Sequence, residues 1–338
     1  MYIVTGATGF IGSNLLHAMQ QKGFDDIVVV DDFGNGDKWR NIAKRGALRF
    51  ILPNQLSLFL DANTTKIEAI FHLGAISSTT ETDVDKIVVN NFQLTVSLYE
   101  FCTSYGIPLI YASSAATYGA GEHGFVDRDD LTFLSSLQPL NPYGWSKNSV
   151  DKFIAARPHS PWQEMQHSCC TPQKKPQVVG LKFFNVYGPN EYHKGMQMSV
   201  VRHFFEQYRQ KGYVRLFKSY RADCADGEQR RDFVWVGDCV SVMLWMLEHP
   251  QVSGLFNVGT GHATSYNTVA ESIAHSMGIE PKIEYIDMPD SVRNQYQYFT
   301  EADLTKLRSA GYDHPFKSVP EGVDTYVRNF LATNDIYL

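Results

Sequence analysis

Tyr143 and Lys147 have the spacing that most directly suggests chemistry. They open the segment 143–157, which the apolar periodicity predicts to be a helix, and a spacing of four places both side chains on one helix face. An ammonium beside a phenol favours the phenolate, so Lys147 is expected to lower the pKa of Tyr143 from about 10 towards neutrality. Such a phenolate could accept a hydroxyl proton during hydride transfer. Ser114, at the end of an earlier apolar run, could hydrogen-bond the same substrate oxygen.

The spacing of Tyr143 and Lys147 is weak evidence for catalysis by itself, but a glycine-rich stretch near the start of the sequence supports it. Gly6, Gly9 and Gly12 follow a predicted strand at 2–5 and open a predicted helix at 10–22. Gly6 permits a tight turn, Gly9 lets the backbone approach a pyrophosphate, and Gly12 lets helix and strand pack closely. The helix N-terminus offers free N–H groups and a partial positive charge to the anion. The stretch therefore predicts a dinucleotide site.

Asp31 is the acidic residue that such a site requires about 20 residues further on. It ends the second predicted strand, 27–31, and is expected to accept hydrogen bonds from the adenosine ribose. Asp31 and Asp32 repel a 2′-phosphate, whereas Lys38 and Arg40 could offset that charge. These residues alone leave both NAD and NADP open.

The elements that must position these groups alternate between strand and helix. Beyond the segments already named, strands are predicted at 69–73, 109–112 and 178–184, and a helix at 84–105. This order predicts an α/β fold, a Rossmann-type doubly wound parallel sheet covered by helices on both faces, with a smaller mixed α/β lobe over the carboxyl ends of the strands.

The chain is expected to divide near residue 177. Residues 1–177 should form the dinucleotide-binding domain, and residues 178–338 mostly the substrate-binding lobe, with some segments returning to the first domain. Within the first part, 158–177 has four prolines and no usable period, which is typical of a surface insertion.

Composition excludes several classes of partner. The chain of 338 residues has 43% hydrophobic residues, a net charge of −6 and no clustered Lys and Arg, so no nucleic-acid partner is expected. No apolar run reaches the roughly 20 residues that span a bilayer, and the first strand begins at Tyr2, so a cytoplasmic protein without a membrane partner is expected. The five cysteines lack paired spacing, so no metal site is expected.

Several segments together resemble a known family. GATGFIG at 6–12, FHLGA at 71–75, YASSAATYG at 111–119 and YGWSK at 143–147 resemble the extended short-chain dehydrogenases that epimerise or dehydrate nucleotide-sugars. Over nearly the whole chain, the similarity is to the branch that epimerises ADP-heptose at C6, and it is carried by SSTTE at 77–81, SSAATYG at 113–119, LKFFNVYGPNEYHKG at 181–195, RRDFVWVGD at 230–238, FNVGTG at 256–261 and YQYFTEADLTKLRSAGYDHPFK at 296–317.

The resemblance implies an isomerase that holds one NADP, or NAD, per subunit and acts on ADP-heptose. It also implies a closed homo-oligomer, a pentamer. A ketone would form at C6, turn within the pocket and be reduced on its other face, so acid/base groups are needed on two sides. The resemblance assigns the second such role to Lys194, which alone would more simply be a phosphate contact or surface charge.

Binding residues are implied in the same way, residue by residue. Besides the three glycines, those for the cofactor are Phe10, Ile11, Asp31, Asp32, Lys38, Leu73, Gly74, Ala75, Ile76, Ser77, Asn90, Tyr143, Lys147, Val186 and Lys194. Besides Ser114, those for the substrate are Asn185, His203, Phe217, Lys218, Ser219, Tyr220, Arg231 and Tyr296. The guanidinium of Arg231 suits a pyrophosphate, although an internal ion pair with Asp232 is the simpler alternative.

Three departures from the family pattern bear on these expectations. A basic residue that helps some relatives bind a 2′-phosphate is absent near Leu52 and Pro53, which weakens the case for NADP. Met196 stands where relatives often have a small hydroxyl residue, which puts one substrate hydrogen bond in doubt. The segment 158–177 is longer than usual.

Rival functions differ in the residues they need. A 4,6-dehydratase requires an Asp-Glu pair after the serine strand, and 115–118 has no carboxylate. A UDP-hexose 4-epimerase needs only one tyrosine base, so Lys194 argues against it, but it remains the main enzymatic alternative. A non-catalytic dinucleotide-binding sensor or scaffold is the alternative from another class; such proteins commonly lose the tyrosine or lysine, and this chain retains both.

Overall fold

The computed structural model describes residues 1–157, 176–293 and 296–338. Its centre is a seven-stranded sheet in the order β11-β6-β5-β4-β1-β2-β3, and every pairing in it is parallel. The strands are β1 (Tyr2–Thr5), β2 (Ile27–Val30), β3 (Arg49–Ile51), β4 (Ala69–His72), β5 (Leu109–Ser114), β6 (Val178–Phe183) and β11 (Gly254–Val258). The predicted doubly wound sheet is confirmed.

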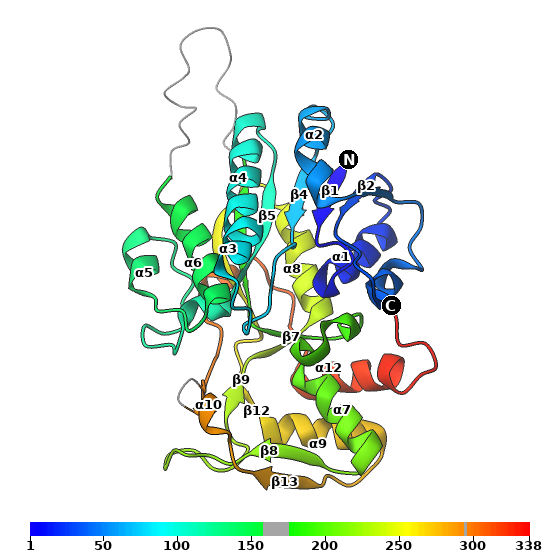
Figure 1. Cartoon of the computed structure of the whole chain (residues 1–338), viewed down its shortest axis with the longest axis vertical. Helices are drawn as coiled ribbons and strands as arrows, with labels where there is room; N and C mark the ends of the chain where they lie inside the picture. The colour runs from blue at the N-terminus through cyan, green and yellow to red at the C-terminus, as the bar shows by residue number, and fades with distance from the viewer. Residues whose placement is uncertain (158–175, 294–295) are drawn as a thin grey trace.

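Helices cover both faces of this sheet (Figure 1). They are α1 (Phe10–Gln21), α2 (Leu56–Asp61), α3 (Val84–Ile87), α4 (Leu94–Tyr105), α5 (Leu131–Ser136), α6 (Pro142–Ala155), α8 (Val236–Glu248) and α11 (Thr305–Ser309). The predicted helix 84–105 consists of α3, a π-helical turn η3 (Val88–Gln93) and α4. The other expected ends differ from the observed ones by one or two residues, which is the ordinary uncertainty of helix and strand ends.

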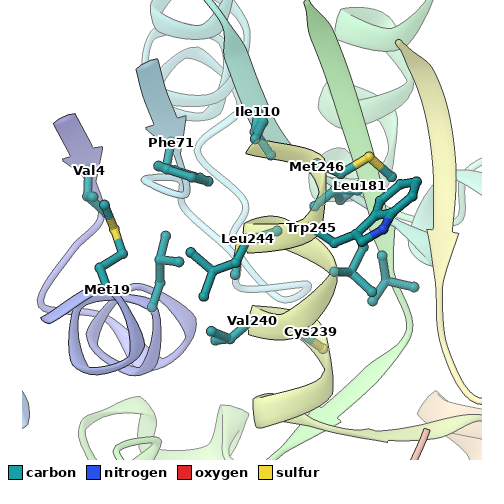
Figure 2. Close-up of a cluster of buried hydrophobic side chains, with 14 of the residues drawn as sticks. Val4, Met19, Phe71, Ile110, Leu181, Cys239, Val240, Leu244, Trp245 and Met246 are labelled. Carbon is teal, nitrogen blue, oxygen red and sulfur yellow. The ribbon is translucent and has the colours of Figure 1, made fainter. Parts of the chain in front are cut away.

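Alternation along the strands divides the core into two layers. In β1, Ile3 packs into the cluster under α4 and α6, while Val4 packs into the cluster under α1 and α8. Figure 2 shows the second layer, where Met19 of α1 lies below Val4 of β1, and Val240 and Leu244 of α8 lie beside Met19. All these side chains are almost fully buried, so the sheet is a rigid base for whatever lies at its strand ends.

The second half of the chain also builds a smaller lobe, at the bottom of Figure 1. It has its own apolar cluster, formed mainly by α7 (Val200–Lys211), α9 (Tyr266–Met277) and α12 (Val319–Tyr326). Its two-stranded sheets pair β10 with β7, β12 with β9, and β13 with β8. Those strands are β7 (Asn185–Tyr187), β8 (Val214–Phe217), β9 (Arg230–Arg231), β10 (Phe233–Trp235), β12 (Thr264–Ser265) and β13 (Ile283–Ile286).

Short turns complete the chain. They are the 3-10 turns η1 (Asp37–Ile42), η2 (Pro53–Gln55), η4 (Ala115–Tyr118) and η6 (Tyr192–Gln197), the helix α10 (Asp290–Arg293) and the π-helical turn η7 (Val327–Leu331). Segments of the second half, β6, α8 and β11, complete the large sheet and its cover.

The expected insertion at 158–177 lies outside the described residues except for its last two positions. In the described part of the chain, no helix is long and apolar enough to cross a membrane.

Candidate active site

A cavity of about 530 Å³ lies where β1, β4 and β5 end. Its walls come from six separate stretches of the chain, and most of the predicted cofactor residues line it. These are Gly6, Gly9, Phe10, Ile11, Gly12, Asp31, Lys38, Leu73, Gly74, Ala75, Ile76, Ser77, Tyr143, Lys147, Val186 and Lys194, together with the predicted substrate contact Ser114. The residues that sequence reasoning grouped from separate motifs therefore share one site.

The glycine loop forms the floor of this cavity. Gly6 has φ +66°, and a Cβ added to it would lie 2.5 Å from the backbone nitrogen of Gly74. A Cβ on Gly12 would lie 2.2 Å from the carbonyl oxygen of Gly6. Since α1 begins after Gly9 without a side-chain cap, its first N–H groups are free for an anion. This cradle fits a dinucleotide pyrophosphate.

Asp31 has both carboxylate oxygens occupied. Oδ2 accepts hydrogen bonds from the backbone N–H of Thr8 at 2.8 Å and from its hydroxyl at 2.7 Å. Oδ1 accepts from the N–H of Asp32 at 2.8 Å and from Lys38 Nζ at 2.5 Å. The exposed Asp32 itself is not among the residues lining the cavity. Lys38 thus lines the cavity as one of the four donors to the Asp31 carboxylate.

The Tyr143 and Lys147 pair lies on one face of α6, as predicted. The helix starts sharply because the Asn141 side chain accepts a hydrogen bond from the N–H of Gly144 at 2.8 Å and Pro142 occupies its first position. Lys147 is buried and donates from Nζ to the carbonyl oxygen of Ala112 on β5 at 2.7 Å. The pair is therefore fixed to the strand that ends in Ser114.

The expected fall in the pKa of Tyr143 is wrong. Burial raises the pKa of Tyr143, the Asp151 carboxylate raises it further, and only the hydrogen bond to Ser114 opposes them. Burial also lowers the pKa of Lys147 to about 8, although Asp151 opposes this shift. Spacing on a helix revealed that the two side chains share a face, but not that desolvation dominates there.

Asp151 itself is a residue that sequence reasoning missed. It stands four positions after Lys147 on the same face of α6, and its Oδ2 accepts hydrogen bonds from Lys182 Nζ at 2.6 Å and from Ser113 Oγ at 2.7 Å. Tyr111 donates to its Oδ1 at 3.0 Å. Asp151 and Lys182 are both fully buried, so this network braces the strand behind Ser114. Tyr143, Lys147 and Asp151 follow one another at intervals of four residues, and this spacing could have indicated that Asp151 shares their helix face.

Lys194 reaches the cavity from the other side, on η6. Its Nζ lies 5.6 Å from the centre of the Phe10 ring, at the start of α1. Burial lowers the pKa of Lys194, and the nearby Glu191 carboxylate opposes that shift. His193 and Gln197 line the cavity too, although sequence reasoning named neither. In the sequence, only their closeness to Lys194 could have indicated that they line the cavity.

Asn90 is a predicted cofactor residue that is not among those lining the cavity. It is exposed, and its side chain donates to the carbonyl oxygen of Lys86 at 2.8 Å. The adjacent Asn91 is buried instead. Its Oδ1 accepts from the N–H of Ile76 at 2.8 Å and its Nδ2 donates to the Ile76 carbonyl at 3.0 Å. In this structure Asn91, not Asn90, holds the loop after β4.

The remaining predicted substrate residues belong to the smaller lobe or lead into it, and none is among the residues lining the cavity. They are Asn185, His203, Phe217, Lys218, Ser219, Tyr220, Arg231 and Tyr296. His203 on α7 approaches the Lys194 segment, with Nε2 3.4 Å from the carbonyl oxygen of Met196. The ring of Tyr296 lies 6.2 Å from that of Phe217 and 5.5 Å from the Arg231 guanidinium carbon.

Three of these residues already have partners within the lobe. Lys218 forms an ion pair with Asp287 at 3.1 Å, and Tyr220 donates to the same carboxylate oxygen at 3.3 Å. Ser219 is held through its N–H by Asp226 at 2.7 Å. The segment 217–220 is thus ordered around acidic side chains.

Arg231 is not held by Asp232. Its guanidinium donates to the carbonyl oxygens of Arg230, at 2.9 Å, and Gln297. Asp232 accepts instead from Thr260, Gly261 and Ala302, and no ion pair joins it to Arg231 among the described residues. The internal ion pair considered above is therefore absent from that part of the chain, and a buried guanidinium without a carboxylate partner suits an anion.

Neither a metal site nor a disulfide is present among the described residues. Cys102 and Cys239 are buried free thiols, and Cys224 is partly buried. Buried His72 is explained by structure, since its ring lies between the hydroxyls of Thr5, at 2.7 Å, and Thr95, at 2.9 Å.

Comparison with known proteins identifies the family of this chain. Residues 2–259 match the NAD dependent epimerase/dehydratase family. The ADP-L-glycero-D-manno-heptose-6-epimerase of Nitratidesulfovibrio vulgaris is 44% identical over 100% of both chains. The crystal structure of the Helicobacter pylori ADP-L-glycero-D-manno-heptose-6-epimerase superposes with a TM-score of 0.77 at 27% identity, covering 97% of this chain and 95% of that one.

A structure with bound ligands is also similar. MoeE5 in complex with UDP-glucuronic acid and NAD has a TM-score of 0.70 at 26% identity, covering 97% of this chain and 99% of that one. The N. vulgaris relative matches the whole chain, and the family model matches residues 2–259. The chain belongs to the NAD-dependent epimerase/dehydratase family and, within it, to the family of the ADP-L-glycero-D-manno-heptose-6-epimerases.

Proposed function

We propose that this protein interconverts ADP-D-glycero-D-manno-heptose and its L-glycero epimer by oxidising C6 to a ketone and reducing it again on the opposite face. The observation that carries the proposal is the presence of two proton-transfer groups in one cavity. Tyr143, with Ser114 and Lys147, comes from α6 and β5, whereas Lys194 comes from η6. Family membership supports the same reaction.

Tyr143 serves one half of the reaction. Ser114 and Tyr143 would hydrogen-bond the C6 oxygen, and Tyr143 would take or return its proton while the bound nicotinamide accepts or gives the hydride. The raised pKa of Tyr143 keeps the phenol protonated at neutral pH, which suits proton donation to the ketone. A positively charged, oxidised nicotinamide would favour the phenolate in the opposite direction.

Lys194 serves the other half. After the ketone has turned, its oxygen faces η6, and the Lys194 ammonium would supply the proton. Burial lowers the pKa of Lys194, which makes the neutral amine accessible for the reverse transfer. The 5.6 Å separation of Lys194 Nζ from the Phe10 ring supports a position beside the cofactor.

NADP is the proposed cofactor, with one molecule per subunit. Asp31 already accepts four hydrogen bonds, which leaves it little capacity for a ribose hydroxyl, and Lys38 lines the same end of the cavity. A 2′-phosphate could take a hydrogen bond from the remaining N–H of Lys38. The lack of a basic residue at Leu52 and Pro53 argues for NAD, so the choice depends on Lys38.

The ADP-heptose would extend from the cavity towards the smaller lobe. Arg231, buried and without a carboxylate partner among the described residues, would bind its pyrophosphate, and the rings of Phe217 and Tyr296 would contact the nucleoside. Gln297, next to Tyr296, donates to the carbonyl oxygen of Gly119 at 2.6 Å, which connects this cluster to the loop after Ser114. From the family resemblance we also propose a cytoplasmic homo-oligomer, a pentamer, which sedimentation equilibrium would test.

The experiment that tests the function is direct. Purified protein is incubated with ADP-D-glycero-D-manno-heptose, and the ratio of the two C6 epimers is followed by NMR, with UDP-galactose as the control substrate. The proposal predicts that the heptose ratio approaches equilibrium while UDP-galactose is unchanged. A heptose ratio that stays constant refutes it, and conversion of UDP-galactose alone indicates a 4-epimerase.

A further inference from the structure

A buried carboxylate that the proposed reaction does not use stands three residues before Lys194. Glu191 is 1% exposed. Its Oε1 accepts hydrogen bonds from the Ser199 hydroxyl at 2.7 Å and from the Tyr326 hydroxyl at 3.0 Å, and its Oε2 accepts from the Ser199 backbone N–H. A carboxylate this deeply buried is stable only because these donors replace water.

The same hydrogen bonds close a loop. Glu191 begins the segment 191–199 and Ser199 ends it as the N-cap of α7, so one side chain joins the two ends. Within the loop, the N–H of Lys194 donates to the Glu191 carbonyl at 3.0 Å. Gly195 has φ +55° and ψ −123°, a conformation that strongly favours glycine, and a Cβ there would meet no atom within 4 Å. The shape of the loop therefore depends on its backbone and its closure.

The closed loop is also attached to the cofactor side of the site. Asn190, buried and with φ +72°, donates from Nδ2 to the Ser13 hydroxyl at 3.0 Å and to the Asn41 carbonyl at 3.2 Å. Ser13 belongs to α1, whose first turn lines the cavity. On the opposite side, Tyr326 connects Glu191 to α12. Asn190 and Glu191 therefore both help to hold the loop that carries Lys194 in place between α1 and α12.

We propose that Glu191 is the positioning residue for the second proton-transfer group: its buried carboxylate closes the loop that carries Lys194 and so holds that ammonium beside the reacting carbon. The inference rests on the proposed function, because it assigns Lys194 a role in proton transfer. A purely structural Glu191 would stabilise the fold without favouring either face of the substrate. The two roles therefore predict different stereochemistry.

The experiment uses a 6-aldehyde analogue of the substrate and protein loaded with nicotinamide deuterated at C4 in its reduced form. Deuteride passes to the aldehyde carbon, a proton passes to the aldehyde oxygen, and the product is a chiral deuterated alcohol whose C6 configuration NMR reads. In the unaltered protein both configurations form, because Tyr143 and Lys194 protonate opposite orientations of the aldehyde.

Glu191→Gln replaces one acceptor oxygen with a donor that faces the donors of Ser199. We expect kcat for epimerisation to fall about 10²-fold, since small misplacements of a reacting group cost that much, with a change in KM of less than about 3-fold. In the Glu191→Gln variant, deuteride should be transferred to only one face of the aldehyde, which is the face that still reacts in the Lys194→Met variant. In the Gly195→Ala variant the added methyl group contacts no side chain, and deuteride should be transferred to the same single face. This variant tests the proposal if Glu191→Gln does not fold.

Asp127→Asn is the matched control. Asp127 is also a buried carboxylate, with Oδ2 accepting from the N–H of Asn257 at 2.8 Å, but it lies outside the loop. It should lower the unfolding temperature comparably and leave both product configurations. Transfer to both faces by Glu191→Gln, while Lys194→Met transfers to one, overturns the positioning role alone. Transfer to both faces by Lys194→Met overturns the proposed second base, and this inference with it.

Discussion

The two sides of the cavity hold their reactive groups in different ways. The helix wall, formed by Ser114, Tyr143 and Lys147, stands on a capped helix and a central strand, and the Asp151 and Lys182 ion pair braces it from behind. The loop wall, 191–199, contains the 3-10 turn η6 and is held by Glu191 and Asn190. It is also held by the Tyr192 hydroxyl, which donates to the Ile336 carbonyl at 2.6 Å, and by His193 Nδ1, which lies 3.1 Å from Asn41 Nδ2. One group is therefore positioned by secondary structure and the other by individual long-range hydrogen bonds.

This difference has a consequence for mutation. On the helix wall many contacts share the task, so the loss of one side chain leaves the others in place. On the loop wall separate side-chain hydrogen bonds share the task, and the loss of those made by Glu191 is expected to move Lys194. We therefore expect substitutions in the loop wall mainly to lower kcat, and substitutions in the helix wall mainly to lower the free energy of unfolding.

The largest effect should follow removal of either reactive group. Tyr143→Phe and Lys194→Met should each lower kcat for epimerisation by about 10²–10⁴-fold, because each removes a general acid and base. The double variant should lose little more, since the two groups act in sequence on one substrate. Steady-state rates from NMR of the epimer ratio measure this. A Lys194→Met variant with native kcat and only a raised KM would make Lys194 a phosphate contact.

Lys38→Ala should change cofactor choice. The variant should weaken NADP binding by about 1–3 kcal/mol more than NAD binding, the value of a charge-assisted hydrogen bond to the 2′-phosphate. Titration of the cofactor-free protein with each dinucleotide measures the difference, with Lys44→Ala as a nearby surface control. Equal losses for NAD and NADP would place the 2′ position away from Lys38.

Acid should destabilise the sheet under the helix wall. Burial lowers the pKa of His72 from 6.5 to about 3, so between those values the unfolded chain binds a proton that the folded chain does not. The free energy of unfolding should therefore fall as pH falls, and this one group contributes about 2 kcal/mol between pH 7 and pH 5. Urea unfolding at the two pH values measures the change, and His72→Gln should reduce it. An unchanged pH dependence in His72→Gln would assign the effect to other groups.

The smallest effect concerns the cap of α6. Asn141→Ala removes the acceptor of the Gly144 N–H and should cost about 1 kcal/mol of stability. If the helix wall is as redundantly held as described, kcat should change by less than about 3-fold. Chemical unfolding and steady-state kinetics on the same variant test both statements. A large fall in kcat would show that the helix wall, too, depends on a single contact.

The sequence predicted what local patterns determine. Gly6, Gly9 and Gly12 identified the strand, turn and helix of the cofactor site, and the spacing of Tyr143 and Lys147 identified their shared helix face. Alternating strands and helices were enough to predict the parallel sheet. These features depend on periodicities of two and 3.6 residues and on backbone geometry, which a single sequence displays.

The rest depends on contacts between distant residues. Glu191 meets Tyr326 and Asn190 meets Ser13 across 135 and 177 residues, and no local pattern announces either pair. The direction of the Tyr143 pKa shift was wrong for the same reason, because burial is a property of the assembled site. Lys194 and Asn90 were named only from family resemblance, and no local pattern indicates that the neighbouring Asn91 is the buried residue that holds the loop after β4.

The central claim is that Tyr143 and Lys194 act on opposite faces of one ketone, and the deuteride experiment tests it most directly when applied to those two residues. Tyr143→Phe and Lys194→Met, each loaded with the deuterated reduced cofactor and given the 6-aldehyde analogue, should form alcohols of opposite C6 configuration, and the double variant should form neither at an appreciable rate. The same configuration from both single variants would contradict the account, because both groups would then serve one orientation of the substrate.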